Sequence, residues 1–509
     1  MRFLVGALLV ALEAAGATPE SQFRFDSSHT GVAGEATIAP SGLAWRAALG
    51  GRVRGTPAVA DGLAFVGGEG GRLAAVRLKD GSTAWSAETG TDLSSSPAVA
   101  GGLVALLGRD GTLRAFDVAT GAVRWTRALG RDLAGGRDPR TWDLWVSSPC
   151  VRGETLFVGG GDGGIHALSL RTGEPLWRFE TAGRVRSTPA VVGGRAFVGS
   201  FDGNVYALDA STGALLWKHD TGAPVQSSPA VDGGLVFFGS RAATVTALDA
   251  ATSAPRWKAE HPNGSWVLGS PAVAGGRVFV GSSDEQFLQA LDAATGKELW
   301  RLAVRGRVIG APTVSGKSVL FGTEDAHLFS ADTATGLLLG GEFTEGGLVG
   351  GVVPADGLLL AGCDDGWLYA FRAARVDDLL PVTAPADVAG LRGAWKMAAG
   401  PSLTFRAREG RLEAVVASLP PAMVFRKGGA PRRSAPRPRA EARAGRGGRP
   451  CGARRPEGDA RDPVRPCRGG GRRPLNGRRP RPTGRRNVPA GGAVRRPPRG
   501  SAVRAGASA

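Results

Sequence analysis

The chain has 509 residues, 42% of them hydrophobic, and a formal net charge of +18 at pH 7. This charge is concentrated at one end, because residues 428–509 hold 23 Arg and 4 acidic residues and leave 40 basic and 41 acidic residues before them. Residues 1–427 are therefore nearly neutral, and we expect no nucleic-acid partner, since binding to phosphates requires a basic surface.

Residues 1–17 have the composition of a secretory signal peptide. Arg2 precedes the apolar run FLVGALLVAL, and Ala15 and Ala17 are spaced as in an A-x-A cleavage site. The run is too short for a membrane-spanning helix. No Cys follows it, so we expect no lipoprotein anchor. The sequence predicts a periplasmic or secreted protein without a transmembrane span.

A repeat fills the next 350 or so residues. The stretch YALDASTGALLW ends at Trp217, and related stretches recur at steps of mostly 40 residues, each with an SPAV-like element upstream. The last copy of that element is degenerate and lies around Val352. The prolines of the other elements are Pro57, Pro97, Pro149, Pro189, Pro229, Pro271 and Pro312.

Each of these eight units contains four short segments with strand character: SPAVxGG, RAFVGS, NVYALD and ALLW in the fourth unit. One such four-stranded sheet cannot bury both of its faces, but a ring of them can. The predicted fold class is therefore all-β, an eight-bladed β-propeller over residues 23–374.

The repeated tryptophans are predicted to be structural, because a buried indole contributes a large apolar area. Within the same repeat, we expect Asp209 to accept N–H bonds from the following turn and Gly213 to supply its positive φ. The tryptophans in question are Trp45, Trp85, Trp125, Trp177, Trp217, Trp257 and Trp300.

The two ends of the repeat region are complementary. The eighth unit ends near Ala374 without a final Trp strand, and the strand around Trp45 has no unit of its own. We expect the strand at Trp45 to complete the unit that contains Trp367, which closes the ring and removes exposed edges.

Residues beyond the propeller have three different compositions. Residues 375–388 are predicted to be a linker, and residues 389–427 an incomplete β-meander, with a hairpin around REG and MVFRK as a third strand. Residues 428–509 cannot build a core and are predicted to be disordered. We interpret this tail as a frameshift product, because 71 of its 82 residues belong to types whose codons have G or C in the middle. The alternative is a genuine basic arm for an anionic partner.

The pattern ALDAxTGxxxW, preceded by SSPAV and by FRFDSSHTG at Phe23–Gly31, resembles the pyrroloquinoline-quinone-like β-propeller repeat family. That resemblance implies either a quinoprotein alcohol dehydrogenase or a non-enzymatic propeller similar to outer-membrane-protein assembly factor B. Fold alone does not decide between them.

The resemblance to dehydrogenases would imply a calcium-bound quinone, a catalytic Asp and, often, an adjacent pair of cysteines. Cys150 and Cys363 are the only cysteines outside the tail, and they fall in units three and eight. Among the positions expected at the axial mouth, Asp92 is the one carboxylate. We therefore expect no cofactor and no metal. Quinone and calcium are expected only under the alternative function, that of a dehydrogenase.

Departures from the repeat mark the candidate binding site. The connection from Trp to Pro has 24 residues between Trp125 and Pro149 and 14 between Trp257 and Pro271, against 12 in five other units. Aromatic and basic residues in these and the equivalent loops predict a rim for a planar anionic ligand or an acidic peptide. The candidates are Trp142, Trp145, Trp266, Arg52, Arg54, Arg184, Arg186, Gln226 and Arg307.

Trp145 has a second interpretation, since by count it occupies the apolar position held by Val53, Val185 and Val225 in other units. The function that these features predict is a non-catalytic binding scaffold for protein partners. The alternatives are a quinone- and calcium-dependent dehydrogenase and a cell-surface or polysaccharide-binding propeller.

Overall fold

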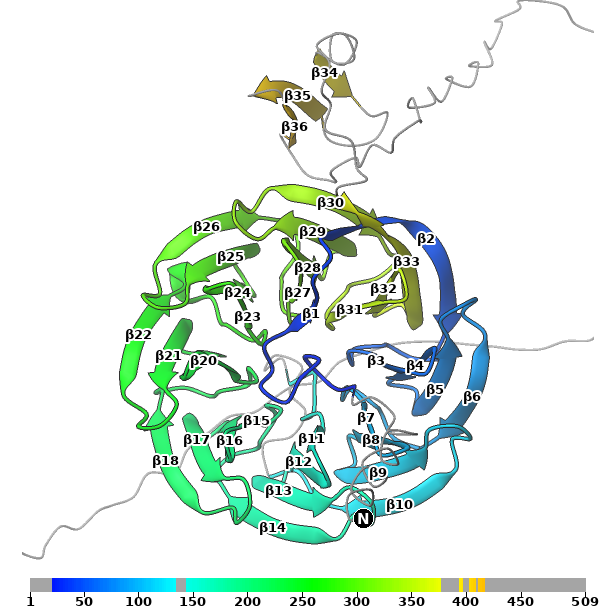
Figure 1. The fold of residues 1–509 in the computed structure, drawn as a ribbon, viewed down its shortest axis with the longest axis vertical. Helices are drawn as coiled ribbons and strands as arrows, with labels where there is room; N and C mark the ends of the chain where they lie inside the picture. Colours follow the sequence, from blue (N-terminus) through cyan, green and yellow to red (C-terminus); the bar gives the residue numbers. More distant parts are fainter. Residues whose placement is uncertain (1–20, 134–142, 377–392, 397–401, 409–410, 417–509) are drawn as a thin grey trace, which may run out of the picture. The chain divides into compact units, whose positions relative to one another are not determined.

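The computed structural model describes residues 21–133 and 143–376, together with three strands at 393–396, 402–408 and 411–416. Eight sheets of four or five strands surround one axis, so the predicted eight-bladed, all-β propeller is confirmed (Figure 1). The predicted signal peptide, most of the linker and the basic tail lie outside the described residues.

Each blade has four strands ordered from the axis outward, and blade 7 carries β1 as a fifth, innermost strand. Blade 1 consists of β3 (Ala58–Ala60), β4 (Leu63–Gly67), β5 (Arg72–Arg77) and β6 (Thr83–Glu88), and blade 2 of β7 (Ala98–Ala100), β8 (Leu103–Leu107), β9 (Thr112–Asp117) and β10 (Val123–Ala128). Blade 3 consists of β11 (Cys150–Arg152), β12 (Thr155–Gly159), β13 (Gly164–Ser169) and β14 (Pro175–Glu180), and blade 4 of β15 (Ala190–Val192), β16 (Arg195–Gly199), β17 (Asn204–Asp209) and β18 (Leu215–Asp220). Blade 5 consists of β19 (Ala230–Asp232), β20 (Leu235–Ser240), β21 (Thr244–Asp249) and β22 (Pro255–Glu260), and blade 6 of β23 (Ala272–Ala274), β24 (Arg277–Gly281), β25 (Phe287–Asp292) and β26 (Glu298–Ala303). Blade 7 consists of β1 (Val32–Gly34), β27 (Thr313–Ser315), β28 (Ser318–Gly322), β29 (His327–Asp332) and β30 (Leu338–Phe343), and blade 8 of β31 (Val352–Ala355), β32 (Leu358–Gly362), β33 (Trp367–Arg375) and β2 (Ile38–Ala48).

The core lies between neighbouring blades. The two middle strands of a blade are buried on both faces, whereas the outermost strand alternates between exposed and partly buried residues. One cluster, for example, joins Phe197 and Val205 of blade 4 to Val236 and Phe238 of blade 5. The run of apolar residues in each RAFVG-like segment is explained by this double burial.

The seven repeated tryptophans lie where adjacent blades meet. Each indole N–H donates to a backbone carbonyl of the next blade at 2.8–3.1 Å, as Trp177 does to Ala210. The ring covers the turn between the third and fourth strands of that blade, where a Cβ on Gly213 would lie 2.7 Å from the Trp177 ring. Glycine is therefore required at this turn by both space and its φ of +73°.

Blade 5 breaks this rule, because Ser253 occupies the turn position with a φ of 64° under Trp217. We expect Ser253→Gly to raise the free energy of unfolding by about 0.5–1 kcal/mol, since a left-handed conformation costs a non-glycine residue about 1–2 kcal/mol and glycine loses part of that gain to chain entropy. The matched change Gly213→Ser should lower it. Denaturant unfolding measures both, and a shift of the same sign in the two variants would contradict this explanation.

An N-terminal strand closes the ring, as predicted. β2 pairs antiparallel with β33, and Trp45 lies opposite Ala370. The outermost strand of blade 8 thus comes from the start of the chain, while its other three strands come from the end of the repeat region (Figure 1).

The residues before β2 form an inner cap, which we define as Ser21–Gly31. In blades 1 to 7, the strand that follows each SPAV-like proline presents one valine whose backbone N–H donates to an oxygen of this segment. By register, the equivalent residue of blade 8 is Pro354, which has no N–H to satisfy. The seven valines are Val59, Val99, Val151, Val191, Val231, Val273 and Val314.

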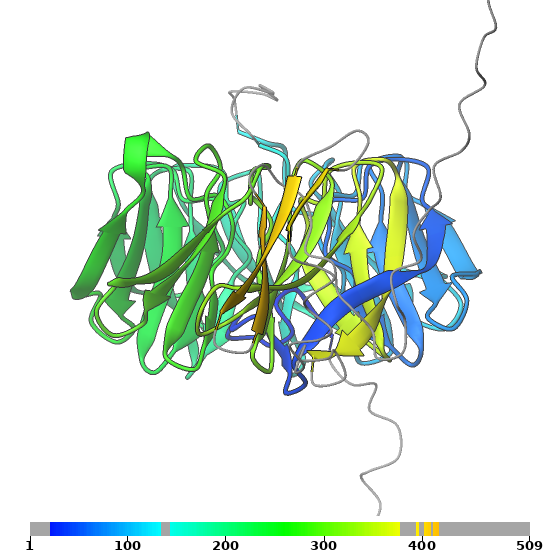
Figure 2. The ribbon, with the colours of Figure 1, turned by 90° about the horizontal axis from the view of Figure 1, so that it is seen from above.

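A buried arginine strengthens the inner cap. The guanidinium of Arg24 donates to the carbonyls of Pro271 and Pro312, in blades 6 and 7. Burial lowers the pKa of Arg24 to about 10, although Asp26 acts in the opposite direction. Figure 2 shows the capping segment in dark blue at one face of the propeller. This face of the axis is therefore closed by the chain itself.

A separate three-stranded antiparallel sheet consists of β34 (Gly393–Lys396), β35 (Ser402–Arg408) and β36 (Arg411–Val416). β35 and β36 pair antiparallel, with Arg408 opposite Arg411, as expected for the predicted hairpin. The third strand precedes the hairpin, whereas the sequence pattern favoured the later MVFRK segment, which lies outside the described residues.

Candidate functional site

The two serines of the SSPAV element have different roles. The first bonds within its own blade, where Ser187 Oγ accepts the N–H of Gly199 and donates to its carbonyl, both at 2.8 Å. The second bonds between blades, because its Oγ accepts the backbone N–H of the equivalent residue in the preceding blade at 2.9–3.0 Å. These second residues form a hydroxyl ring around the axis, which we define as Thr56, Ser96, Ser148, Thr188, Ser228 and Ser270.

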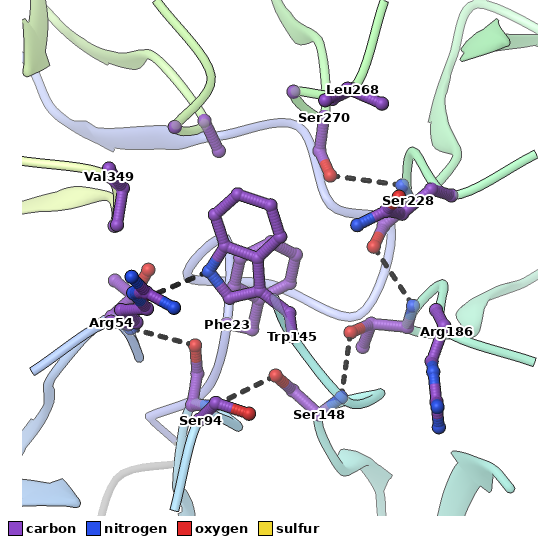
Figure 3. A pocket seen from close by; sticks show the side chains of 18 of the residues that line it. Phe23, Arg54, Ser94, Trp145, Ser148, Arg186, Ser228, Leu268, Ser270 and Val349 are labelled. Atoms are coloured by element: carbon purple, nitrogen blue, oxygen red, sulfur yellow. Dashed lines mark hydrogen bonds between the residues drawn. The ribbon is translucent and has the colours of Figure 1, made fainter. Parts of the chain in front are cut away.

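The hydroxyl ring encloses a small axial cavity. Phe23 of the inner cap and Trp145 both line it, and Leu268, Ile309 and Val349 make one side apolar (Figure 3). The cavity leaves about 60 Å³ for the centres of water molecules. That is room for a few waters, whereas pockets for small organic ligands usually have about 300–1,000 Å³.

Trp145 lies across the axial mouth, on the face opposite the inner cap. Its indole N–H donates to the carbonyl of Arg54 at 3.3 Å, and its ring packs with the cluster of Leu268, Ile309 and Val349. The neighbouring Val146 is buried among the core residues of blades 2 and 3. The apolar position that other units fill with Val53 or Val185 is thus left to Val146, and Trp145 fills the mouth.

The arginines of the mouth are paired with carboxylates that the sequence pattern did not reveal. Arg54 makes two hydrogen bonds to Asp364 at 2.9 and 3.0 Å and one to Glu69 at 3.1 Å. Burial disfavours its charge, but the hydrogen bonds and charges of these two acids outweigh burial and raise the pKa of Arg54. The expectation of a single carboxylate, Asp92, at this mouth is therefore wrong.

Arg186 is the most enclosed of these arginines, with 1% of its side chain exposed. It bonds Asp143 through Nε and Nη2, both at 2.8 Å, and Asp132 at 2.6 Å. Both acids belong to the long connection between Trp125 and Pro149. Burial acts against the ionised form of Asp143, but Arg186, with Arg109 and Arg184, keeps the pKa of Asp143 below its usual value.

Near Arg186, two guanidinium groups and two aromatic rings stack alternately. We call this group the basic ladder, and its members are Arg184, Phe201, Arg241 and Trp266. The Arg241 guanidinium lies 4.8 Å from the ring centres of both Phe201 and Trp266, and that of Arg184 lies 5.6 Å from Phe201. Arg241 also donates to the buried Gln226 at 2.8 Å. Burial lowers the pKa of Arg241; Asp143 acts against that shift and Arg184 adds to it.

Two other predicted rim residues, Arg307 and Arg52, are not part of the basic ladder. Arg307 pairs with Glu324 at 3.1 Å and with Asp284 at 3.5 Å on the side of blades 6 and 7. Arg52 is exposed near blade 1. Trp142 lies outside the described residues.

Of the residues that the sequence analysis missed, Asp132 and Asp143 belong to the long Trp125–Pro149 connection, whose length was the signal for them. Phe201 and Arg241 lie 40 residues apart at one position of the repeat. That position also holds Glu69, Arg109, Glu324 and Asp364 in other blades, so the repeat itself could have pointed to it.

The mouth does not suit a calcium-bound quinone. The axial cavity of about 60 Å³ is too small for a tricyclic cofactor, and Trp145 occupies the place above it. Among the described residues, no group of three or more His, Cys, Asp or Glu could hold a metal ion. Cys150 and Cys363 are buried in blades 3 and 8 and do not form a disulfide, and burial raises the pKa of Cys363 to about 12.

A family model described as outer membrane protein assembly factor BamB matches residues 36–139, 132–259, 201–289 and 267–339. The chain belongs to this family. No curated protein matches the sequence. In the part of the chain that the structure describes, no helix has the length and apolar character needed to cross a membrane.

Solved structures similar to this member of the BamB family include proteins of different kinds. BamB from Moraxella catarrhalis has a TM-score of 0.52 and 20% identity, covering 65% of this chain and 99% of its own. Quinohemoprotein alcohol dehydrogenase from Comamonas testosteroni has a TM-score of 0.58 and 16% identity, with coverages of 70% and 80%. The computationally designed Ika8 protein has a TM-score of 0.54 and 17% identity, with coverages of 65% and 100%. At these identities the likeness concerns the fold alone.

Proposed function

We propose that this protein is a periplasmic or secreted non-catalytic scaffold that binds protein partners at its axial mouth. The observation that carries the proposal is the way the axis is filled. The inner cap closes one face, and Trp145, bonded to the backbone at Arg54, crosses the other. A partner therefore binds on the mouth rather than inside it, over a surface of loops that rigid blades hold in place.

Membership of the BamB family supports the same function, since the family description names an assembly factor. The chemistry of the mouth adds to this support. Its arginines are held in hydrogen-bonded pairs, and aromatic side chains lie between them, which is the composition of energetically important protein interfaces. Oxidation of an alcohol would instead require a base at the substrate and a cation at the quinone.

Site-specific photocrosslinking in the native host tests this function. With the crosslinking residue at Trp266, we expect a discrete protein adduct. With the same residue at Ser211, on an exposed turn of the opposite face, we expect none. Equal adducts at both positions would contradict the proposed binding face. Dye-linked alcohol oxidation by the purified protein after addition of pyrroloquinoline quinone and calcium would contradict the non-catalytic function and favour a dehydrogenase.

A further inference from the structure

Charge is divided between the two sides of the axial mouth. On the side of blades 2 to 5, the guanidinium groups of Arg109, Arg184, Arg186 and Arg241 surround two carboxylates, Asp132 and Asp143. On the other side, Glu69, Asp284, Glu324 and Asp364 surround Arg54 and Arg307. Within these two groups alone, the first has two more guanidinium groups than carboxylates and the second has two fewer; Asp92 near the first group and Arg52, Arg305 and Asp325 near the second are outside this count.

The carboxylates of the first group do not cancel its positive charge. Four guanidinium groups there face only two carboxylates. The two described acids are already shared, because Asp143 lies within 3.7 Å of Arg109, 3.6 Å of Arg184 and 2.8 Å of Arg186. This side of the mouth is therefore complementary to added carboxylates.

The basic ladder gives that charge a defined geometry. Phe201 and Trp266 hold the planes of Arg184 and Arg241 by stacking, and all four side chains remain partly exposed. A stacked guanidinium has lost part of its side-chain freedom before any ligand arrives, so less entropy is lost when it pairs with a carboxylate. Partial burial strengthens such a pair relative to one in open water.

We infer that the basic ladder is the docking site for an acidic segment of a partner protein, whose Glu or Asp side chains pair with Arg184 and Arg241 while its apolar side chains lie against Phe201 and Trp266. This inference rests on the proposed function and names the class of partner. A peptide suits the site better than a small anion, because the enclosed axial cavity is too small for an organic ligand and the excess charge is spread along a row that spans blades 4 to 6.

Three fluorescein-labelled peptides test the inference with the full chain. They share Ser and Phe positions and carry Glu, Gln or Lys at all others. Fluorescence anisotropy should show binding of the Glu peptide, at least about tenfold weaker binding of the Gln peptide, and weakening of the Glu complex by added salt. Arg241→Gln should weaken the Glu complex about tenfold, and Arg241→Lys, which keeps the charge but loses the planar stack, by less.

Arg307→Gln is the matched control, because Arg307 lies at the same mouth within the acidic side. It should leave binding of the Glu peptide unchanged or strengthen it. Thermal unfolding of each variant establishes that it is folded. Equal binding of the Glu and Gln peptides, or equal effects of Arg241→Gln and Arg307→Gln, would overturn the acidic-segment inference while adducts at Trp266 still supported a protein scaffold. The absence of adducts at Trp266 would contradict both the acidic-segment inference and the proposed scaffold function.

Discussion

Deletion of residues 21–48 is expected to abolish cooperative unfolding of the propeller. The deletion removes β2, the outermost strand of blade 8, and leaves the edge of β33 unpaired. It also removes the acceptors of the seven valine N–H groups that bond to the inner cap. Water can reach these donors once the cap is gone, so each lost hydrogen bond costs about 0.5–1.5 kcal/mol net. The summed loss is roughly 5–10 kcal/mol, comparable with the usual stability of a whole domain.

Circular dichroism during heating measures this effect. A chain that ends at residue 388 is the control, and we expect it to unfold like the full chain, because every described strand of the propeller lies before Val376. Adding a synthetic peptide of residues 21–48 to the shortened chain should restore a cooperative transition. An unchanged transition after the deletion would show that neither ring closure nor the inner cap stabilises the fold.

Arg186→Met is expected to lower the free energy of unfolding by about 3–5 kcal/mol at neutral pH, because it leaves the buried Asp143 without its closest partner. Arg305→Ala, at an exposed arginine of an equivalent loop, should change it by less than about 0.5 kcal/mol. Urea unfolding measures both. The double variant Arg186→Met with Asp143→Asn should recover part of the lost free energy of unfolding, because residue 143 then carries no unpaired charge.

The ion pair between Arg186 and Asp143 also predicts that the free energy of unfolding depends on pH. The pKa of Asp143 is lowered in the folded protein. Its contribution to the free energy of unfolding is therefore fully present above the pKa of an unfolded Asp, about 3.9. That contribution is lost as the pH falls towards the lower pKa of the folded state. In the Arg186→Met variant the pKa of Asp143 should rise. The difference in stability between the two proteins should therefore narrow below about pH 4, and a difference that stayed constant there would exclude Asp143 as its source.

The repeat made the architecture predictable from sequence. Spacing of the tryptophans gives eight blades, and the orphan strand at Trp45 together with the missing strand after Trp367 gives the closure. Both inferences need only periodicity, because the blades solve the same packing problem in similar ways; five of them pair a Phe on the second strand with a Trp on the fourth, as at Phe197 and Trp217.

The site was less predictable, because the repeat fixes the positions of most of its partners but not the residue types that fill them. The sequence pointed to Trp145, Trp266, Arg54 and Arg186, all on the connections into innermost strands. Their carboxylates come from the irregular connection or from turns between second and third strands, as Glu69 and Asp364 do for Arg54. Glu69 and Asp364 occupy the same position of the repeat, but both can meet Arg54 only because closure of the ring brings blade 8 beside blade 1.

The inner cap and β2 also impose an order on folding during synthesis. Residues 21–48 leave the ribosome first, but β33 follows more than 300 residues later: the Arg372 guanidinium, for instance, donates to the carbonyl of Leu43 across 329 positions. Until then the growing chain is an open arc with an unpaired edge at each end. Ring closure is the contact with the greatest sequence separation and is therefore the expected slow step. Any factor that held the first strands during that interval would control when the propeller becomes a closed ring.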